Sequence, residues 1–299
     1  MRQPRIKMND QDTWHHCYNR TAGTSSDRPF KDAEKEQFIR ILKRVGTLYT
    51  VRIISYQVMS NHFHILLHAP AQPPSLEETC RRFRQFHYGK RSISPDSPAC
   101  LQWQARCRDV SWFMRHLQHL YTAWYNRSRN IRRRGSLWAD RYKNTILQDG
   151  HAVWACWNYI ENNPVRAGMV EDPADYRFCS YGAWSQSGRH PFESNIRKIV
   201  LPLMQEHFGV VSLGDIRLRM AEMLAAKAGK DWIEPGFTMT IQRSVRHWTD
   251  GLVIGSELFV REVMSRYRPA HEVARHRMAR SRDPACLFAW RRVRPAESG

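Results

Sequence analysis

The clearest alternation of apolar and polar positions lies between residues 51 and 68. Residues 51–58 (VRIISYQV) and 59–68 (MSNHFHILLH) are rich in β-branched and apolar side chains, with a Ser-Asn pair near the junction. They predict two adjacent strands joined by a tight turn at Ser60 and Asn61. The same reasoning predicts further strands at 13–20 and 137–147, and helices at 32–45, from residue 76 onward, and at 110–126 and 151–162.

The order of these elements, β-α-β-β-α-β-α, predicts the fold class. It fits an α+β, ferredoxin-like antiparallel sheet with helices on one face. Asp32, Ser75 and Asp149 are the expected helix caps. Pro95 and Pro98 mark an exposed loop.

The character of the chain changes after about residue 189. Segments with helical patterning alternate with glycine-containing turns, and the end of the chain is rich in arginine. The sequence therefore predicts one domain over residues 1–189 and a helical, basic C-terminal extension over residues 190–299.

Two histidines share one face of the second strand of the pair. Side chains alternate along a strand, so Phe63 points into a core while His62 and His64 point the other way. Their Cβ atoms are then about 7 Å apart, and both rings can lean over one ion. Polar rings on an apolar strand are costly without partners. Surface or satisfied core histidines are nevertheless commoner than metal ligands, so the spacing alone leaves both interpretations open.

The charge balance favours a polyanionic partner. Lys and Arg number 47 against 28 Asp and Glu, giving a net charge of +19, although a basic protein can also be simply soluble. Residues 127–134 form a basic run, and basic side chains recur just after it. The candidate DNA contacts are Arg127, Arg129, Arg132, Arg133, Arg134, Arg141 and Lys143.

Other features of the composition bear on location. No apolar run approaches the ~18 residues of a membrane span, and the first residues lack the apolar segment of a signal peptide. The seven cysteines form no C-x-x-C pair, which is typical of reduced thiols. We therefore expect a cytoplasmic protein without a membrane partner.

A tyrosine and an asparagine lie four residues apart on the helix expected at 151–162. Tyr159 and Asn163 then share a face near its C-terminal end. From periodicity alone, the pair is typical of a half-buried tyrosine and a helix cap.

Several spaced motifs together resemble a known family, the REP-associated tyrosine transposases. These are relatives of the single-tyrosine insertion-sequence transposases of the HUH superfamily. The matching segments are residues 56–64 (YQVMSNHFH), 135–138 (GSLW), 141–143 (RYK), 163–168 (NPVRAG) and 175–180 (DYRFCS). The resemblance covers roughly residues 1–185, and an aromatic-Ser-Ser sequence is commoner in the family than the Phe-Cys-Ser found here.

The resemblance implies an HUH nuclease fold and a DNA strand transferase. Tyr159 becomes the nucleophile, and His62, His64 and Asn163 become ligands of Mg²⁺ or Mn²⁺. The implied reaction cleaves and joins single-stranded or REP-like hairpin DNA through a 5′-phosphotyrosine. It also implies a DNA-binding role for the C-terminal extension, a monomer or homodimer, and association with the bacterial nucleoid.

Three other functions compete with this one. A ferredoxin-like sheet can bind nucleic acid without catalysis, although no glycine-aromatic signature of RNA-recognition domains is present. Replication initiators and relaxases also use a tyrosine but commonly carry a third histidine. A zinc hydrolase using His15 and His16 with the other pair lacks a well-placed carboxylate base.

Overall fold

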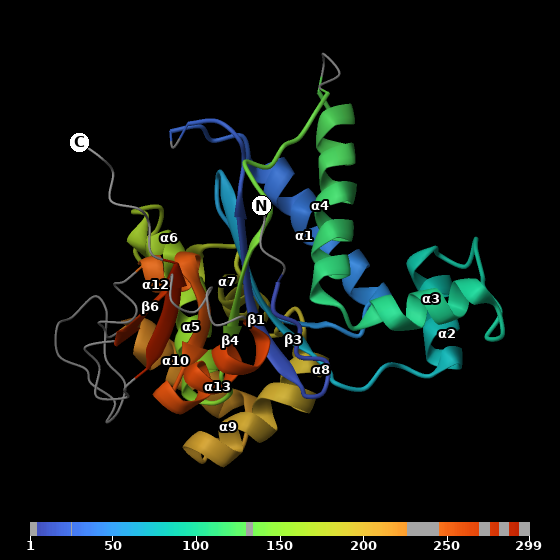
Figure 1. Cartoon of the computed structure of the whole chain (residues 1–299). Helices are drawn as coiled ribbons and strands as arrows, with labels where there is room; N and C mark the ends of the chain where they lie inside the picture. Colours follow the sequence, from blue (N-terminus) through green and yellow to red (C-terminus); the bar gives the residue numbers. More distant parts are fainter. Residues whose placement is uncertain are drawn as a thin grey trace, which may run out of the picture.

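The computed structural model describes residues 5–24, 26–129, 134–225, 245–268, 276–280 and 287–292. Within these residues, seven strands form one sheet in the order β2-β3-β1-β4-β5-β7-β6 (Figure 1). The strands are β1 Thr13–Arg20, β2 Arg52–Val58, β3 His62–Ala69, β4 Lys143–Leu147, β5 Gly251–Gly255, β6 His276–Arg280 and β7 Phe288–Arg292. The class is therefore mixed α+β.

The sheet is mostly antiparallel. β1 pairs antiparallel with both β3 and β4, and β2 pairs antiparallel with β3. The predicted strand at 13–20 and the predicted strand pair are confirmed. The strand expected at 137–147 is shorter, because only its last five residues, β4, join the sheet.

Helices connect and cover these strands. In chain order, the α-helices are α1 Asp32–Leu48, α2 Leu76–Phe86, α3 Pro98–Cys107, α4 Val110–Arg127, α5 His151–Glu161, α6 Asn163–Arg166, α7 Ser180–Ser187, α8 Glu193–Asn195, α9 Leu201–Phe208, α10 Leu213–Ala225, α12 Val245–Asp250 and α13 Glu257–Tyr267. A 3₁₀ turn, η1, spans Pro173–Asp175, and a π-helical turn, η2, spans Ile196–Val200.

Helices lie on both faces of the sheet. Phe63 of β3 packs against Phe38 of α1, with ring centroids 4.7 Å apart. The next residue, His64, faces Tyr159 of α5. Because consecutive side chains of a strand point to opposite faces, α1 and α5 lie on opposite sides, as Figure 1 shows. The expectation of helices on one face is therefore wrong.

The helix starts test the capping predictions. Ser75 accepts a hydrogen bond from the backbone N–H of Glu78 at the start of α2, as predicted. The other two caps are wrong, since the N-cap of α1 is Lys31 and that of α5 is Gly150. Helix α3 begins at Pro98, where the sequence predicts a loop, because proline is well tolerated in the first turn of a helix.

A buried carboxylate fixes α5 against the sheet. Glu161 accepts hydrogen bonds from Ser55 of β2, from Ser180 and the backbone of Tyr181 in α7, and from the indole of Trp157. Burial raises the pKa of Glu161, and these donors oppose that rise. Three of these donors come from β2 and α7, so the buried carboxylate links the helix that carries Tyr159 to both elements.

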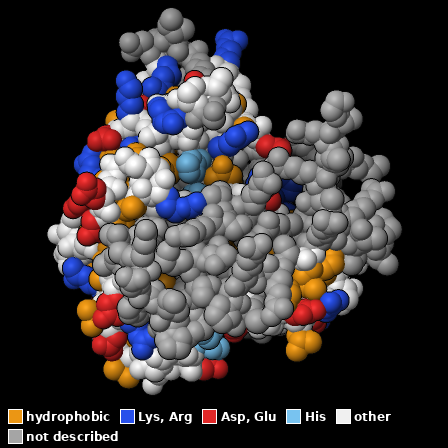
Figure 2. Space-filling model, turned by 90° about the vertical axis from the view of Figure 1, so that its left-hand side faces the viewer, with side chains coloured by type: hydrophobic (Ala, Val, Ile, Leu, Met, Phe, Trp, Pro, Cys, Tyr) orange, Lys and Arg blue, Asp and Glu red, His pale blue; other side chains and the backbone are white. Residues whose placement is uncertain are grey.

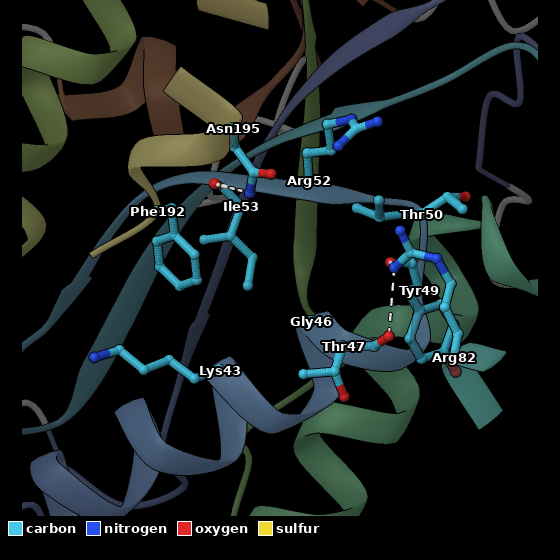
Figure 3. Close-up of a pocket in the computed structure, with 11 residues that line it drawn as sticks. Lys43, Gly46, Thr47, Tyr49, Thr50, Arg52, Ile53, Arg82, Phe192 and Asn195 are labelled. Carbon is cyan, nitrogen blue, oxygen red and sulfur yellow. Dashed lines mark hydrogen bonds between the residues drawn. The ribbon is translucent and has the colours of Figure 1, made fainter. Parts of the chain in front are cut away.

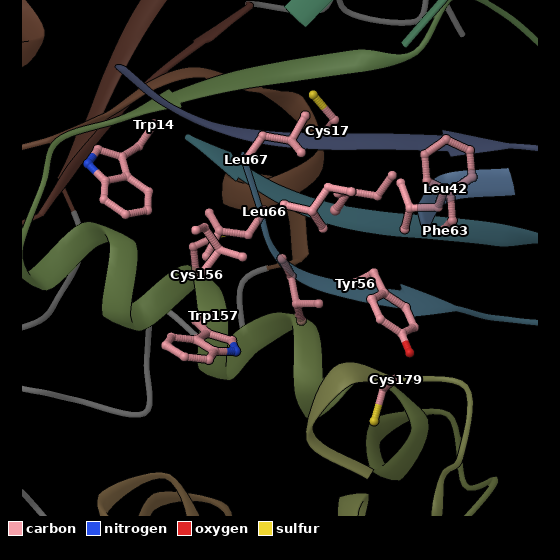
Figure 4. Packing of buried hydrophobic residues seen from close by; sticks show 14 of the residues in the cluster. Trp14, Cys17, Leu42, Tyr56, Phe63, Leu66, Leu67, Cys156, Trp157 and Cys179 are labelled. Carbon is pink, nitrogen blue, oxygen red and sulfur yellow. The ribbon is translucent and has the colours of Figure 1, made fainter. Parts of the chain in front are cut away.

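An apolar layer continues this contact toward the middle of the sheet. Figure 4 shows Leu66 of β3 and Cys156 and Trp157 of α5 in the same packed layer. Each of the three side chains is at most 1% exposed. Burial on this scale contributes about 1.5–3 kcal/mol for a side chain such as Leu66, so α5 is held by apolar packing as well as by Glu161.

The C-terminal residues differ from the helical extension that we expected. β5 pairs in parallel with β4 through Ile146 with Val253 and Leu147 with Ile254, and β7 and β6 follow it. The sequence GLVIG is a short apolar run bounded by glycines, a pattern that also suits a buried strand. No helix in the described parts of the chain is long and apolar enough to cross a membrane.

Buried histidines make the stability of this fold sensitive to acid. Burial lowers the pKa of His15 to about 4 and that of His190 to about 3. The unfolded chain, with histidine pKa values near 6.5, takes up protons first as the pH falls. The free energy of unfolding is therefore not reduced by these histidines above about pH 6.5. As the pH decreases below about 6.5, it decreases by up to about 1.4 kcal/mol per pH unit for each such histidine.

Urea unfolding at pH 7.5, 6 and 5 measures this effect. We expect the midpoint to decrease steadily over this range, and His190→Gln to make the decrease shallower by one histidine's share. A midpoint that is constant from pH 7.5 to 5 would contradict the burial of neutral histidines.

Candidate active site

Aromatic and imidazole rings from four elements meet on the face of the sheet covered by α5. We call His16, His62, His64, Tyr159 and Trp248 the ring cluster, which the ring of Tyr18 in β1 borders at 4.7 Å from that of His64. The ring centroids of His62 and His64 are 5.3 Å apart, and those of His64 and Tyr159 are 5.6 Å apart. His16 of β1 stacks on His64 at 5.0 Å. The structure therefore brings Tyr159 next to the histidine pair from about 95 residues away in the sequence.

Hydrogen bonds fix which nitrogen of His64 carries a proton. Nδ1 of His16 lies 3.0 Å from the carbonyl oxygen of Trp248, which only accepts, so this Nδ1 carries the proton. In the neutral ring, Nε2 of His16 is then an acceptor, and it lies 2.8 Å from Nδ1 of His64. His64 therefore donates through Nδ1, and its lone pair is at Nε2.

The same reasoning applies to His62. Its Nδ1 lies 2.7 Å from the carboxamide oxygen of Asn61, which accepts. The lone pair of neutral His62 is therefore also at Nε2. Both histidines of the pair have one nitrogen held by a neighbouring group and the other available, the arrangement found around metal-binding histidines.

Burial keeps these imidazoles neutral. It lowers the pKa of His16 and of His62 to about 4, and it lowers the pKa of His64 well below its usual value. For His64, the neighbouring His16, His62 and Arg166 act in the same direction. At neutral pH, lone pairs are therefore available at His62 and His64 without the loss of a proton.

Tyr159 is deeply covered. Its side chain is 1% exposed, and the indole of Trp248 in α12 stacks on it with centroids 5.3 Å apart and planes 24° apart. Burial raises the pKa of the Tyr159 phenol, whereas the nearby positive charge of Arg166 lowers it. The Arg166 guanidinium carbon lies 5.2 Å from the centre of the Tyr159 ring. Arg166 is thus the cation placed to stabilise a phenolate.

The residues present fit a divalent cation in part. Two neutral imidazoles offer nitrogen donors. The amide nitrogen of Asn163 donates to the carbonyls of Tyr159 and Ile160, so its oxygen is the atom left for a ligand. Within the described residues, no group of three or more His, Cys, Asp or Glu side chains could hold a metal. A third donor would therefore have to be of another type, such as the Asn163 oxygen, whose role stays a prediction.

The candidate DNA contacts fall into three groups. Arg127, Arg134 and Arg141 are exposed. Arg129 pairs with Glu34 at 2.6 Å, and Lys143 pairs with Asp250 at 2.7 Å. Arg132 and Arg133 lie outside the described residues. Figure 2 shows one face of the molecule on which a histidine lies among Lys and Arg side chains.

Comparison with known proteins gives little further guidance. No family model matches the chain, and no curated protein matches it. One similar solved structure is described as a REP-associated tyrosine transposase bound to a REP hairpin. It shares 14% identity, covers 64% of this chain and 90% of its own, and superposes with a TM-score of 0.38. Similarity of this extent does not establish a common function.

Sequence reasoning missed three members of this site. His16 was considered only as part of a zinc hydrolase, although it lies on the neighbouring strand and contacts His64. Arg166 lies seven residues after Tyr159, about two helical turns, and that spacing was the available signal. Trp248 comes from a distant segment and carried no local signal.

Proposed function

We propose that this protein cleaves and rejoins one strand of single-stranded or hairpin DNA through a covalent bond to Tyr159. The observation that carries the proposal is the placement of the Tyr159 ring 5.6 Å from that of His64, with Arg166 beside it. A phenol, paired imidazoles and a cation form a suitable set for attack on a phosphodiester. The excess of basic residues favours DNA as the substrate.

The proposed reaction conserves the energy of the phosphodiester. The phenolic oxygen of Tyr159 loses its proton and bonds to phosphorus, while the bond from phosphorus to the 3′ oxygen breaks. The products are a 5′-phosphotyrosine and a free 3′-hydroxyl. Attack by a 3′-hydroxyl on the phosphotyrosine reverses the step and releases Tyr159, so ATP is not needed.

Different residues of the chain have different roles in this reaction. Arg166 stabilises the phenolate and the negative charge on the phosphate. His62 and His64, whose lone pairs are at Nε2, would hold a divalent cation, with Asn163 as the proposed third ligand. When bound, Mg²⁺ or Mn²⁺ would polarise the phosphate and neutralise charge that develops on it. His16 orients His64 from behind.

The C-terminal segment has to move for DNA to reach this tyrosine. Trp248 covers Tyr159, and the backbone carbonyl of Trp248 holds His16. We propose that an incoming nucleotide displaces the indole or takes its place in the stack. Residues 190–299 would then act both on the site and in DNA binding, rather than as a separate extension of residues 1–189.

The strand order supports the HUH nuclease arrangement. β4-β1-β3-β2 is an antiparallel set of four strands with α1 between β1 and β2, as expected of a ferredoxin-like unit. The pair His62 and His64 lies on β3, inside this set. The sheet thus supplies a rigid base for the site.

One observation favours a second function. A tyrosine that is 1% exposed under a stacked tryptophan suits a purely structural role. Under that alternative, the protein binds nucleic acid through its basic surface without cleaving it.

A covalent-adduct assay decides between the two. The full chain is incubated with Mn²⁺ and a hairpin oligonucleotide that has single-stranded flanks and a label at its 3′ end. We expect a labelled band of protein mass on a denaturing gel, with the DNA mapped to Tyr159 by peptide mass spectrometry. Tight binding with no adduct under any metal condition would favour the non-catalytic alternative.

A further inference from the structure

A basic hollow lies beside the edge strand β2, away from the ring cluster. It is bounded by the end of α1, the start of β2, α2 and the region around α8, and it encloses about 190 Å³ (Figure 3). We call it the edge pocket. Lys43, Arg52 and Arg82 line it, and none of its lining residues is acidic. The pocket thus concentrates positive charge where nothing in the proposed reaction requires it.

The three cations play different parts. Arg82 is held in place, since it pairs with Glu78 at 2.7 Å and donates to the carbonyls of Thr47 and Tyr49. Among the described residues, neither Lys43 nor Arg52 takes part in an ion pair. Figure 3 shows the Lys43 side chain pointing to the opposite end of the hollow from Arg52 and Arg82, so the charge available to a ligand is that of Arg52, beside the fixed guanidinium of Arg82.

Buried donors in this pocket have no protein partner. The Nε of Arg52 and the hydroxyl oxygen of Thr50 are both buried and form no hydrogen bond in the described structure. A buried polar group without a partner is destabilising, so such groups usually have a ligand or water. The Arg82 guanidinium also repels that of Arg52; Asp12 and Glu78 act against this repulsion, and an anion between the two guanidinium groups would reduce it further.

We propose that the edge pocket binds a phosphate group. Phosphate offers acceptor oxygens and negative charge, which match the Arg52 guanidinium, the neighbouring Arg82 and the Thr50 hydroxyl. The volume is below the roughly 300–1,000 Å³ of pockets that enclose whole small molecules, so it suits one phosphate rather than a complete nucleotide. The group belongs either to the backbone of DNA or to a free phosphate or phosphate ester.

The position of the pocket separates it from the tyrosine site. Arg52 pairs with His68 of β3, six residues beyond His62, which is about 20 Å along the strand. That distance is roughly six base-pair steps of duplex DNA. The proposal that the edge pocket binds phosphate does not depend on the proposed function. If the phosphate belongs to DNA, the pocket would add a second DNA contact to that function.

Titration of the full chain with inorganic phosphate tests the site. Calorimetry at low ionic strength should show saturable binding that weakens about tenfold in Arg52→Gln, because this variant loses a charge-assisted contact. Arg40→Gln is the matched control, since Arg40 lies on α1 outside the pocket, where its side chain is 71% exposed and pairs with Glu36. Thermal melting establishes that each variant folds, and Thr50→Val, which removes the unpartnered hydroxyl, carries the test if Arg52→Gln does not fold.

A second titration, with hairpin DNA, identifies the source of the phosphate. If the phosphate is part of DNA, Arg52→Gln and Thr50→Val should both weaken hairpin binding, and Arg52→Gln should also reduce its salt slope by about one. Unchanged hairpin binding with weakened phosphate binding assigns the pocket to a free phosphate or phosphate ester. Absence of saturable phosphate binding, or equal affinities in the pocket variants and Arg40→Gln, overturns the proposal. Neither result depends on adduct formation at Tyr159.

Discussion

Tyr159→Phe is expected to abolish the covalent DNA adduct while leaving hairpin affinity within about twofold. The substitution removes only the nucleophilic oxygen, and the ring that Trp248 stacks on remains. Because the packing of α5 is unchanged, the variant should fold like the parent. The denaturing-gel assay with 3′-labelled DNA measures the adduct, and fluorescence anisotropy measures the affinity.

Tyr18 provides the sharpest control for this prediction. Its ring lies 4.7 Å from that of His64, closer than the Tyr159 ring, and it is partly exposed. If Tyr159 is the nucleophile, Tyr18→Phe should still form the adduct. An adduct that persists in Tyr159→Phe and disappears in Tyr18→Phe would move the nucleophile to β1 and refute our assignment.

His64→Ala is expected to reduce metal-dependent cleavage by at least about a hundredfold. It removes one of two nitrogen donors to the proposed cation and the group that His16 orients. The loss should appear as weaker Mn²⁺ binding in calorimetry as well as slower adduct formation. A binding measurement without DNA separates the loss of the metal from a change in DNA affinity.

His68→Ala is the matched control on the same strand. His68 lies four residues further along the same face of β3, where it pairs with Asp12 at 3.1 Å rather than joining the ring cluster. Its removal should leave Mn²⁺ binding and cleavage within about twofold. If His64→Ala and His68→Ala bind Mn²⁺ equally well, His64 is not a ligand and the metal site must be sought elsewhere.

Up to residue 69, the sequence predicted the strands well, because their patterns are local, whereas β5, β6 and β7 were not expected. The alternation around His62 and the apolar run before it were enough to place β2, β3 and their turn. Helix starts were less reliable, since capping depends on backbone geometry. Gly150, at φ 66°, precedes α5 where Asp149 was expected to cap it.

The site itself could be predicted only where motifs from a family resemblance supplied the long-range information. That resemblance suggested a link between Tyr159 and the histidine pair, and the structure places the two side by side. It did not suggest Trp248, which reaches the site through the parallel pairing of β5 with β4. Pairing between strands that are far apart in sequence leaves no periodic signal in either one, so this part of the cluster could not be seen in advance.

The pairing of β5 with β4 also affects how shortened forms of this protein should be interpreted. A chain ending before Gly251 would leave the outer backbone groups of Ile146 and Leu147 open to solvent. An uncovered strand edge is a template for edge-to-edge association between molecules. Aggregation of such a fragment would therefore result from the unprotected edge of β4. Loss of activity in that fragment would not show that the removed residues contact DNA.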